Sequence, residues 1–326
     1  MKKYDVVGIG NALLDFIVEV DDGILAEMNL AKGQFTLIDK EKSKELLKKL
    51  EKHEVKTAPG GSSANTLAGV SVLGGNAVLI GKVGKDKHGD IYEQKTSDCG
   101  VNVKFSRHKS EMTGHCITFI TPDAERTFAT HLGAALHLRK KDIFEKEIKA
   151  SKILHTEGYQ LEDPILKEAA VHAMKIAKKN GIKVSIDLSD PGLIGRNLEP
   201  IKKLVKDYAD IVFVNEIEAE VLTGKKDEEA LHEIYDMCEI AVVKLGEKGS
   251  LIKANNIIYK IPINKVKVVN TNGAGDAYAA GILYSIANNI SIEKAGKIAA
   301  YISSQVVAST GARLDRSLKE EIKKFK

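Results

Sequence analysis

Short apolar runs alternate with longer stretches of mixed polarity along most of the chain. Runs of four to seven residues rich in Val, Ile and Leu predict buried strands. These strands are residues 4–9, 77–83, 153–156, 183–187, 211–214 and 240–245. The stretches between them have apolar residues at helical spacing. The helices predicted there cover 40–52, 62–73, 88–99, 164–180, 216–222, 275–288 and 292–309. Such alternation indicates a mostly parallel sheet covered on both faces.

Between residues 104 and 131 the pattern changes to extended segments separated by turn residues. Segments 115–120 and 127–131 flank the turn 121–124 and predict a hairpin. Further extended segments are expected at 16–20 and 34–38, with a second hairpin at 250–253 and 257–261. We therefore expect a large α/β domain into which a small β lid is inserted. The large domain would comprise residues 1–15, 39–103 and 132–326, and the lid residues 16–38 and 104–131.

Composition excludes several classes of protein. The 326 residues are 43% hydrophobic and 29% charged with a net charge of +4, which is ordinary for a globular protein. Charges of both signs are interspersed, so a nucleic-acid partner is not expected. No long apolar run or signal-like start is present, so we expect no membrane span and a cytoplasmic location. Three widely spaced cysteines argue against a disulfide framework or a zinc site.

Residues 270–276, Asn-Thr-Asn-Gly-Ala-Gly-Asp, directly precede and begin the predicted helix 275–288. Small residues let backbone N–H groups approach an anion, and a helix N-terminus adds unpaired donors and partial positive charge. Asp276 has the wrong charge to bind an anion, so it is interpreted as a base that takes a proton from a hydroxyl. The helix N-terminus is expected to lower its pKa. The alternative is an Asp that only stabilises the helix start.

Two segments in the N-terminal part of the chain contain paired or closely spaced glycines, one at the end of a predicted strand and one just before a predicted helix. Gly8-Ile9-Gly10 follows a strand, but a dinucleotide-binding fingerprint would need a third glycine where Leu13 stands. Asp15 lies near the carboxyl edge of the sheet and would accept hydrogen bonds from two sugar hydroxyls, or form a turn. Gly60 and Gly61 would let the backbone approach a ligand closely, with Asn65 binding a polyol. A glycine-rich helix N-cap is the alternative there.

Two further motifs each have a structural explanation beside a functional one. Asn215 and Glu218 have the spacing of a capping box at a helix start. Their functional interpretation is that Glu218 holds Mg²⁺ through water near bound phosphates. Residues 242–250 predict a strand, a tight turn at Gly246 and Gly249, and a second strand. The added hypothesis is that the Gly246 backbone contacts a nucleotide.

Together these motifs, in this order, resemble the ribokinase (PfkB) family of ATP-dependent sugar and nucleoside kinases, over residues 4 to about 314. The stretches 271–276 and 10–15 look like the adenosine-kinase branch. The stretches 122–127 and 157–159 look like bacterial adenosine-kinase-like members that are described only as sugar kinases. The resemblance implies a ribokinase-like three-layer α/β/α sandwich with a mostly parallel central sheet and a small β-sheet lid. It implies ATP with Mg²⁺, a small-molecule nucleoside or sugar as partner, and a monomer or homodimer.

The resemblance also implies roles for particular residues. Asp276 would be the base, and the backbone N–H groups of Gly273, Ala274 and Gly275 would form an anion hole. The lid would close over the acceptor and exclude water. Residues that would hold the acceptor are Asn11, Asp15, Gly60, Gly61 and Asn65. Residues that would contact the nucleotide are Asn215, Lys244, Gly246, Gly249, Gly273 and Gly275.

Two residues depart from the family pattern. Asn270 stands where the family usually has Asp, which puts activation by a monovalent cation such as K⁺ in doubt. Lys244 stands where Thr is frequent, and it would either reach ATP phosphates or point to solvent. Arg126, in the predicted lid hairpin, would either clamp the transferring phosphoryl group or form a surface ion pair with Asp123 or Glu125.

The expected reaction is transfer of the γ-phosphoryl group of ATP to the primary hydroxyl of a nucleoside, with adenosine first among candidates. A nucleoside site needs an apolar or aromatic platform for the base, for which Phe16, Phe128 and Tyr159 are candidates. The alternatives are a kinase of a free sugar such as ribose or fructose, and a non-catalytic protein that binds a sugar or nucleotide.

Overall fold

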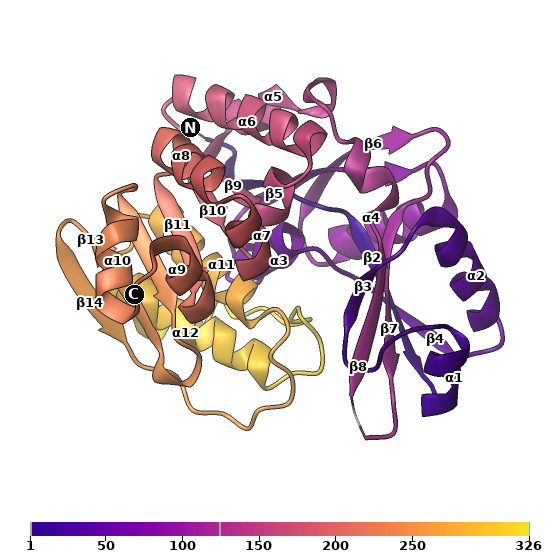
Figure 1. Cartoon of the computed structure of the whole chain (residues 1–326). Coiled ribbons are helices and arrows are strands. Elements are labelled where there is room, and N and C mark those ends of the chain that lie inside the picture. The colour runs from indigo at the N-terminus through magenta and orange to yellow at the C-terminus, as the bar shows by residue number, and fades with distance from the viewer. Residues whose placement is uncertain (1, 124, 326) are drawn as a thin grey trace.

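The computed structural model describes residues 2–123 and 125–325 and contains two sheets of unequal size (Figure 1). The large sheet has nine strands. These are β1 (Tyr4–Ile9), β5 (Ala77–Gly84), β6 (Asn102–His108), β9 (Ser151–Glu157), β10 (Lys183–Asp187), β11 (Ile211–Asn215), β12 (Ile240–Lys244), β13 (Ser250–Ala254) and β14 (Ile257–Ile261). Their order is β14-β13-β12-β11-β10-β9-β1-β5-β6. The pairs β12–β13 and β13–β14 are antiparallel, and all other neighbouring pairs are parallel. The predicted mostly parallel sheet is confirmed.

Helices cover both faces of this sheet, and each face has its own apolar core. One core contains residues of α3 (Ser62–Val72), α4 (Lys87–Asp98), α11 (Ala274–Ala287) and α12 (Ile292–Val307). The other contains residues of α5 (Glu145–Lys149), α6 (Pro164–Lys179), α7 (Pro191–Arg196), α8 (Leu198–Tyr208), α9 (Glu216–Thr223) and α10 (Asp227–Tyr235). In β1, Val6 packs into the first core and Val7 into the second, because successive strand side chains point to opposite faces.

The small sheet lies beside the large one (Figure 1) and has five strands. These are β2 (Leu13–Glu19), β3 (Phe35–Leu37), β4 (Val55–Pro59), β7 (Gly114–Ile120) and β8 (Arg126–His131), in the order β3-β8-β7-β2-β4. The helices α1 (Asp22–Glu27) and α2 (Lys40–Leu50) come from the same part of the chain. The predicted hairpin is confirmed as β7 and β8, which pair antiparallel. Of its predicted turn, Ala124 lies outside the described residues.

Two strands belong to a different sheet from the one expected for their part of the sequence. β6 pairs with β5, so residues 104–108 belong to the large sheet although they were expected in the lid. β4 pairs with β2 and adds a strand to the small sheet that the sequence pattern did not predict. In each pair one strand, β4 or β6, has a weak strand pattern, and its partner is fixed only by the fold. The division of the chain into domains remains a prediction.

Short 3₁₀ helices complete the described part of the chain: η1 (Gly133–His137), η2 (Lys140–Asp142), η3 (Gly158–Leu161), η4 (Gly246–Lys248) and η5 (Glu321–Phe325). No helix among the described residues is long and apolar enough to cross a membrane. In β2, Leu14, Phe16 and Val18 are buried, whereas Asp15 and Ile17 are only half-buried. The half-buried face of β2 is the one that lines the site described below.

Candidate active site

Polar residues end four neighbouring strands of the large sheet. Glu157, Asp187, Asn215 and Lys244 are the last residues of β9, β10, β11 and β12. Glu157 is aligned with Asp187 and Asn215 with Lys244 in the strand register. Because these strands are parallel, their carboxyl ends meet at one edge, which is where open α/β sheets bind ligands. Glu157 and Asp187 were not among the predicted site residues, although a polar residue ending an apolar strand is the signal that marked Asn215.

The loop before α11 has the close backbone packing that its glycines predicted. Gly273 precedes α11 with a φ of 79°, in the left-handed region that favours glycine. A Cβ at this position would lie 2.6 Å from the carbonyl oxygen of Ala312, so a side chain does not fit. A Cβ on Gly275 would lie 3.2 Å from Lys244 Nζ, so the loop and this lysine are in close contact. The loop thus presents small residues and a cation beside a helix N-terminus, a combination suited to phosphate.

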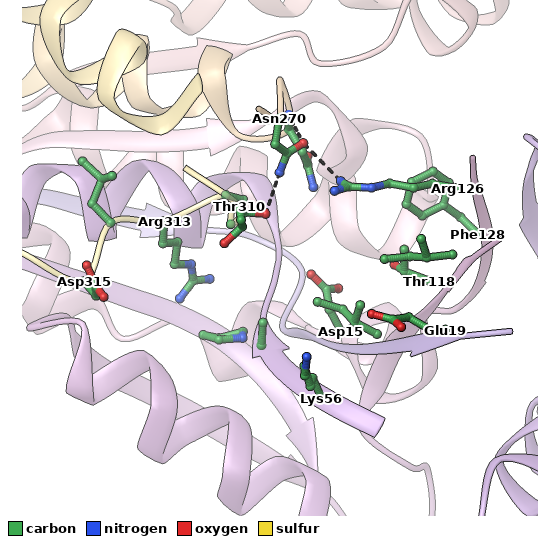
Figure 2. Close-up of a pocket in the computed structure, with 18 of the residues that line it drawn as sticks. Asp15, Glu19, Lys56, Thr118, Arg126, Phe128, Asn270, Thr310, Arg313 and Asp315 are labelled. Atoms are coloured by element: carbon green, nitrogen blue, oxygen red, sulfur yellow. Dashed lines mark hydrogen bonds between the residues drawn. The ribbon is translucent and has the colours of Figure 1, made fainter. Parts of the chain in front are cut away.

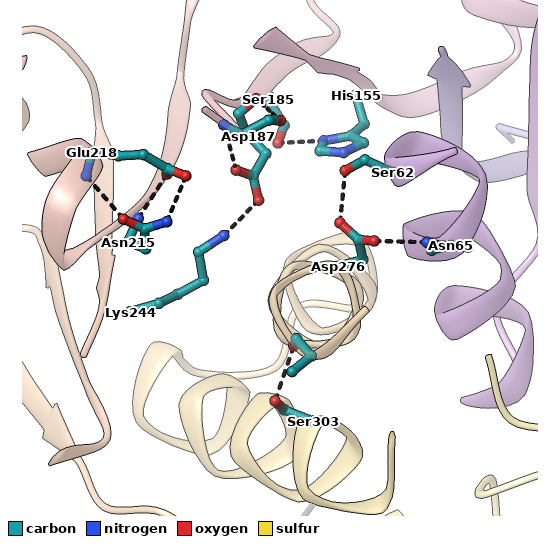
Figure 3. Close-up of polar contacts among 12 residues, drawn as sticks. Ser62, Asn65, His155, Ser185, Asp187, Asn215, Glu218, Lys244, Asp276 and Ser303 are labelled. Atoms are coloured by element: carbon teal, nitrogen blue, oxygen red, sulfur yellow. Dashed lines mark hydrogen bonds and ion pairs between the residues drawn. The ribbon is translucent and has the colours of Figure 1, made fainter. Parts of the chain in front are cut away.

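Asp276 lies in the first turn of α11 and is held by two residues of α3 (Figure 3). Ser62 Oγ donates to its Oδ1 at 2.6 Å, and Asn65 Nδ2 donates to its Oδ2 at 2.8 Å. Burial raises the pKa of Asp276, and the two hydrogen bonds oppose that rise. The lowered pKa expected from the helix N-terminus is therefore wrong in direction, because removal of the carboxylate from water has the larger effect. A raised pKa makes Asp276 a stronger base.

Asp15 lies against the turn that precedes α3. A Cβ on Gly60 would lie 2.6 Å from Asp15 Oδ1, so the missing side chain makes room for this carboxylate. Gly61 has a φ of 91°, and a Cβ there would lie 2.3 Å from the carbonyl oxygen of Asn11. Burial raises the pKa of Asp15 to about 7, while Arg313 acts in the opposite direction.

Asn11 was predicted to contact the acceptor, but its side chain lines neither of the two cavities described below. It is 6% exposed, and its Oδ1 accepts a hydrogen bond from Gln160 Nε2 at 2.8 Å. Its backbone N–H donates to Glu157, which also accepts from the backbone N–H of Ser63. Asn11 therefore packs against the turn at Gly61 from the protein interior, and Glu157 links the two segments. Burial raises the pKa of Glu157 to about 7, despite these two hydrogen bonds.

Lys244 points into the site rather than to solvent. Its Nζ forms an ion pair with Asp187 Oδ2 at 2.7 Å, with side chains 16% and 4% exposed (Figure 3). Asn215 and Glu218 form the expected capping box: Glu218 N–H donates to Asn215 Oδ1, and both Glu218 oxygens accept from Asn215. Burial, followed by the charge of Asp187, raises the pKa of Glu218 to about 7.

In the turn between β12 and β13, both predicted glycines have a positive φ, which favours glycine. Gly246 has a φ of 57° and begins η4, and a Cβ there would meet nothing within 4 Å. Gly249 has a φ of 92°, and a Cβ there would lie 2.1 Å from the carbonyl oxygen of Ile261. Gly249 is therefore required by the backbone, while Gly246 leaves open space above the turn.

Arg126 connects the small sheet to the loop before α11. Its Nη1 donates to Asn270 Oδ1 at 3.1 Å, and Asn270 Nδ2 donates to the carbonyl oxygen of Thr310 at 3.0 Å (Figure 2). Asp123, one expected ion-pair partner of Arg126, instead pairs with Lys32 at 2.7 Å. Arg126 thus lies at the site and not in the surface ion pair with Asp123.

Two cavities lie along these residues. The larger, about 780 Å³, lies between the small sheet and the 310–315 segment, with Asp15, Arg126 and Arg313 in its wall (Figure 2). The smaller, about 360 Å³, is lined by Asp276, Lys244, Glu218 and the loop before α11. Both are lined by Asp15, Asn272 and Ala312, so the two cavities adjoin each other. Of the expected aromatic platform, only Phe128 lines the larger cavity: Phe16 is buried beneath the sheet and Tyr159 lines the smaller cavity.

A carboxylate beside a glycine-rich helix start, a cation and an adjoining second cavity form the arrangement that an alcohol phosphotransferase needs. The sequence matches the pfkB family of carbohydrate kinases over residues 29–319, and the chain belongs to this family. It is an ATP-dependent phosphotransferase acting on a sugar or a nucleoside. This membership favours an enzyme over the non-catalytic alternative.

Solved structures of similar proteins agree with this assignment. An adenosine kinase from Sinorhizobium meliloti is 33% identical with a TM-score of 0.88, and a probable sugar kinase from Rhizobium etli is 33% identical with a TM-score of 0.89. Each match covers 99% of both chains, which confirms the predicted ribokinase-like fold. A 5-dehydro-2-deoxygluconokinase from Listeria monocytogenes is 30% identical over 81% of this chain and 85% of its own length.

Proposed function

We propose that this kinase phosphorylates the primary hydroxyl of a nucleoside, with adenosine as the first candidate. The observation that carries the proposal is the larger cavity, whose volume of about 780 Å³ is within the range of small-molecule sites. Ile17, Ile120 and Phe128 line it beside the carboxylate of Asp15. A purine base would bury its flat apolar faces against such residues, whereas a free sugar has hydroxyls on most sides and gains little from them. The adenosine kinase at 33% identity supports the same choice.

In the proposed reaction Asp276 accepts the proton of the attacking hydroxyl. Its two oxygens are held by Ser62 and Asn65, so the carboxylate is oriented before the acceptor arrives. Charge in the transition state spreads over the transferring phosphoryl oxygens. The N–H groups at the start of α11, from Gly273 to Gly275, together with Lys244, would stabilise that charge.

Magnesium would be bound together with ATP, and the residues of the site fit a contact with the ion through water rather than direct coordination. Among the described residues no cluster of three His, Cys, Asp or Glu side chains could hold a metal ion. Glu218 lines the smaller cavity, but both of its oxygens already accept hydrogen bonds from Asn215. Each oxygen keeps a second lone pair, so Glu218 would hold Mg²⁺ through water. When bound, the ion would neutralise phosphate charge.

We expect turnover that does not depend on a monovalent cation. Asn270 is neutral, and its amide nitrogen donates a hydrogen bond to the Thr310 carbonyl oxygen, which is then less available to a cation. Changing KCl to choline chloride at constant ionic strength should alter wild-type kcat by no more than about twofold. Asn270→Asp restores a charge and removes that donor, so this variant should gain K⁺ dependence. Strong activation of the wild-type enzyme by K⁺ would contradict this role for Asn270.

Arg126 is proposed to bind the transferring phosphoryl group when the lid is closed. Its hydrogen bond to Asn270 places the guanidinium over the loop before α11, and Asn270 leaves its charge unneutralised. We expect Arg126→Ala to lower kcat by about 100-fold, the loss of one charge-assisted contact in the transition state.

Lys32→Ala is the matched control for Arg126, since Lys32 is a cation near the same hairpin that pairs with Asp22 and Asp123. Steady-state kinetics of the two variants decide the matter. A near-wild-type Arg126→Ala enzyme, equal to the Lys32→Ala control, would show that Arg126 has only a surface role.

The acceptor is tested by ADP release, coupled to a reporter reaction, across nucleosides, ribose, fructose and 5-dehydro-2-deoxygluconate. The proposal expects the highest kcat/KM with a nucleoside. A free sugar or sugar acid as the best acceptor would instead support the alternative, which the Listeria relative favours. A cytoplasmic location and a monomeric or homodimeric state remain predictions.

A further inference from the structure

Arg313 makes contacts that reach both ends of the segment that holds Asp276. Its Nε donates to Asn65 Oδ1 at 2.8 Å, and its Nη2 donates to the carbonyl oxygen of Gly60 at 2.9 Å. Between these two points lies Ser62, which donates to Asp276. One guanidinium group, supplied by a residue 248 positions from Asn65, therefore spans the whole segment 60–65.

The contact with Asn65 has a chemical consequence beyond packing. A side-chain amide can present either its oxygen or its NH₂ group to a neighbour, and its surroundings decide which. Arg313 has donors only, so it must face Oδ1, and this turns Nδ2 of Asn65 toward Asp276. In the opposite orientation, the amide oxygen would face the carboxylate without a hydrogen atom between them.

The contact with Gly60 fixes the other end of the segment. The same carbonyl oxygen accepts a second hydrogen bond, from Tyr92 Oη at 3.0 Å, and Tyr92 is fully buried in α4. Two donors on one carbonyl oxygen hold the peptide plane in one direction. The backbone that leads to Ser62 is thereby tied to α4 and to the 310–315 segment at once.

We propose that Arg313 is a positioning residue for phosphoryl transfer: it fixes the Asn65 amide and the Gly60 carbonyl so that Ser62 and Asn65 hold Asp276 toward the acceptor hydroxyl. Arg313 acts through Asn65 and does not need to touch the reacting atoms. The inference rests on the proposed role of Asp276 as base, but not on which acceptor is used.

The first test is the pH dependence of kcat at saturating ATP and acceptor. Hydrogen bonds from Ser62 and Asn65 lower the pKa of Asp276 against the effect of burial, so loss of the Asn65 bond should raise it. In Arg313→Met, we expect the acid limb of kcat to move up by about one pH unit. At pH 7 kcat should fall by about tenfold. The charged groups that act on Asp276, Asp187 and Lys244, remain in place, as do Glu157 and Tyr159, whose pKa values the charge of Asp276 raises.

A double-mutant cycle separates positioning from a general structural effect. If Arg313 acts through Asn65, Arg313→Met should cost clearly less in an Asn65→Ala background than in the wild type, because the amide that it orients is gone and only the contact with Gly60 is left to lose. Arg313→Lys keeps one donor and should recover part of the loss. Should Arg313→Met fail to fold, as judged by its circular dichroism, the same cycle is run with Arg313→Lys.

Arg316→Met is the matched control from the same segment, since Arg316 is exposed and contacts Gln305 and Glu321 at the surface. It should keep the wild-type kcat and pH profile. An unmoved acid limb in Arg313→Met, or losses that multiply in the double mutant, would overturn the inference. Asp276→Asn tests the base assignment separately: an inactive Asp276→Asn enzyme with an unchanged Arg313→Met enzyme rejects only the role of Arg313.

Discussion

We expect Asp276→Asn to lower kcat by about 10³-fold, the usual scale for losing a positioned general base. The amide has nearly the volume of the carboxylate but cannot accept the proton of the acceptor hydroxyl. It also offers one acceptor oxygen in place of two, so Ser62 and Asn65 can no longer both donate to it as they do to Asp276. Single-turnover kinetics with ATP and the best acceptor of the panel measure the loss.

ATP affinity is the control for Asp276→Asn. Phosphates would be held mainly by the loop before α11 and Lys244, so the Kd for ATP measured by calorimetry should change little or become tighter as a negative charge is lost. Asp207→Asn, at an exposed i,i+4 pair with Lys203, provides a carboxylate-to-amide change away from the site. A kcat within about tenfold of wild type would show that Asp276 is not the base.

We expect Asp15→Ala to raise the KM for the acceptor by about 100-fold, the cost of two charge-assisted hydrogen bonds to sugar hydroxyls. The carboxylate lies beside Gly60 at the junction of the two cavities, away from the turn at Gly246. The KM for ATP should therefore change little. Equal increases in both KM values would reject a specific role of Asp15 in acceptor binding.

The pH dependence of acceptor binding gives a second measure of Asp15. Burial raises its pKa to about 7, so the carboxylate is ionised above this pH and increasingly protonated below it. Protonation removes acceptor capacity for the sugar hydroxyls. The wild-type acceptor KM should therefore rise as the pH falls from 8 to 6, about 7 being the midpoint. Asp15→Asn, which keeps the volume, should show no such titration.

Much of the large sheet could be predicted because its signals are local. The strand at 183–187 was predicted with the bounds that β10 has, and the hairpin of β13 and β14 was found within a residue. Strands with weak patterns were missed: β4 contains Lys56 and ends in Pro59, and five of the seven residues of β6 (Asn102–His108) are polar. Such segments become strands because a partner strand is already in place.

The candidate site could be predicted only where a motif carries its own chemistry. The loop before α11, the Gly60–Asn65 segment and the capping box of Asn215 and Glu218 were each found from adjacent residues. Asp187 has no motif around it, and Glu157 was noted only as part of the stretch 157–159. The strand register of β9 and β10 is what places these two carboxylates side by side. Asn11, expected to contact the acceptor, is turned into the core by Gln160.

The sequence by itself determined most of the elements and the small-residue turn before α11, and it predicted Asp276 as the base, because periodicity and helix-start chemistry act within a few residues. Only the tertiary structure decided which distant side chains meet. Ser62 reaches Asp276 across 214 positions, and Arg313 reaches Asn65 across 248. It also decided the direction in which the pKa of Asp276 shifts, since the burial that raises this pKa exists only after the helices and sheets have packed.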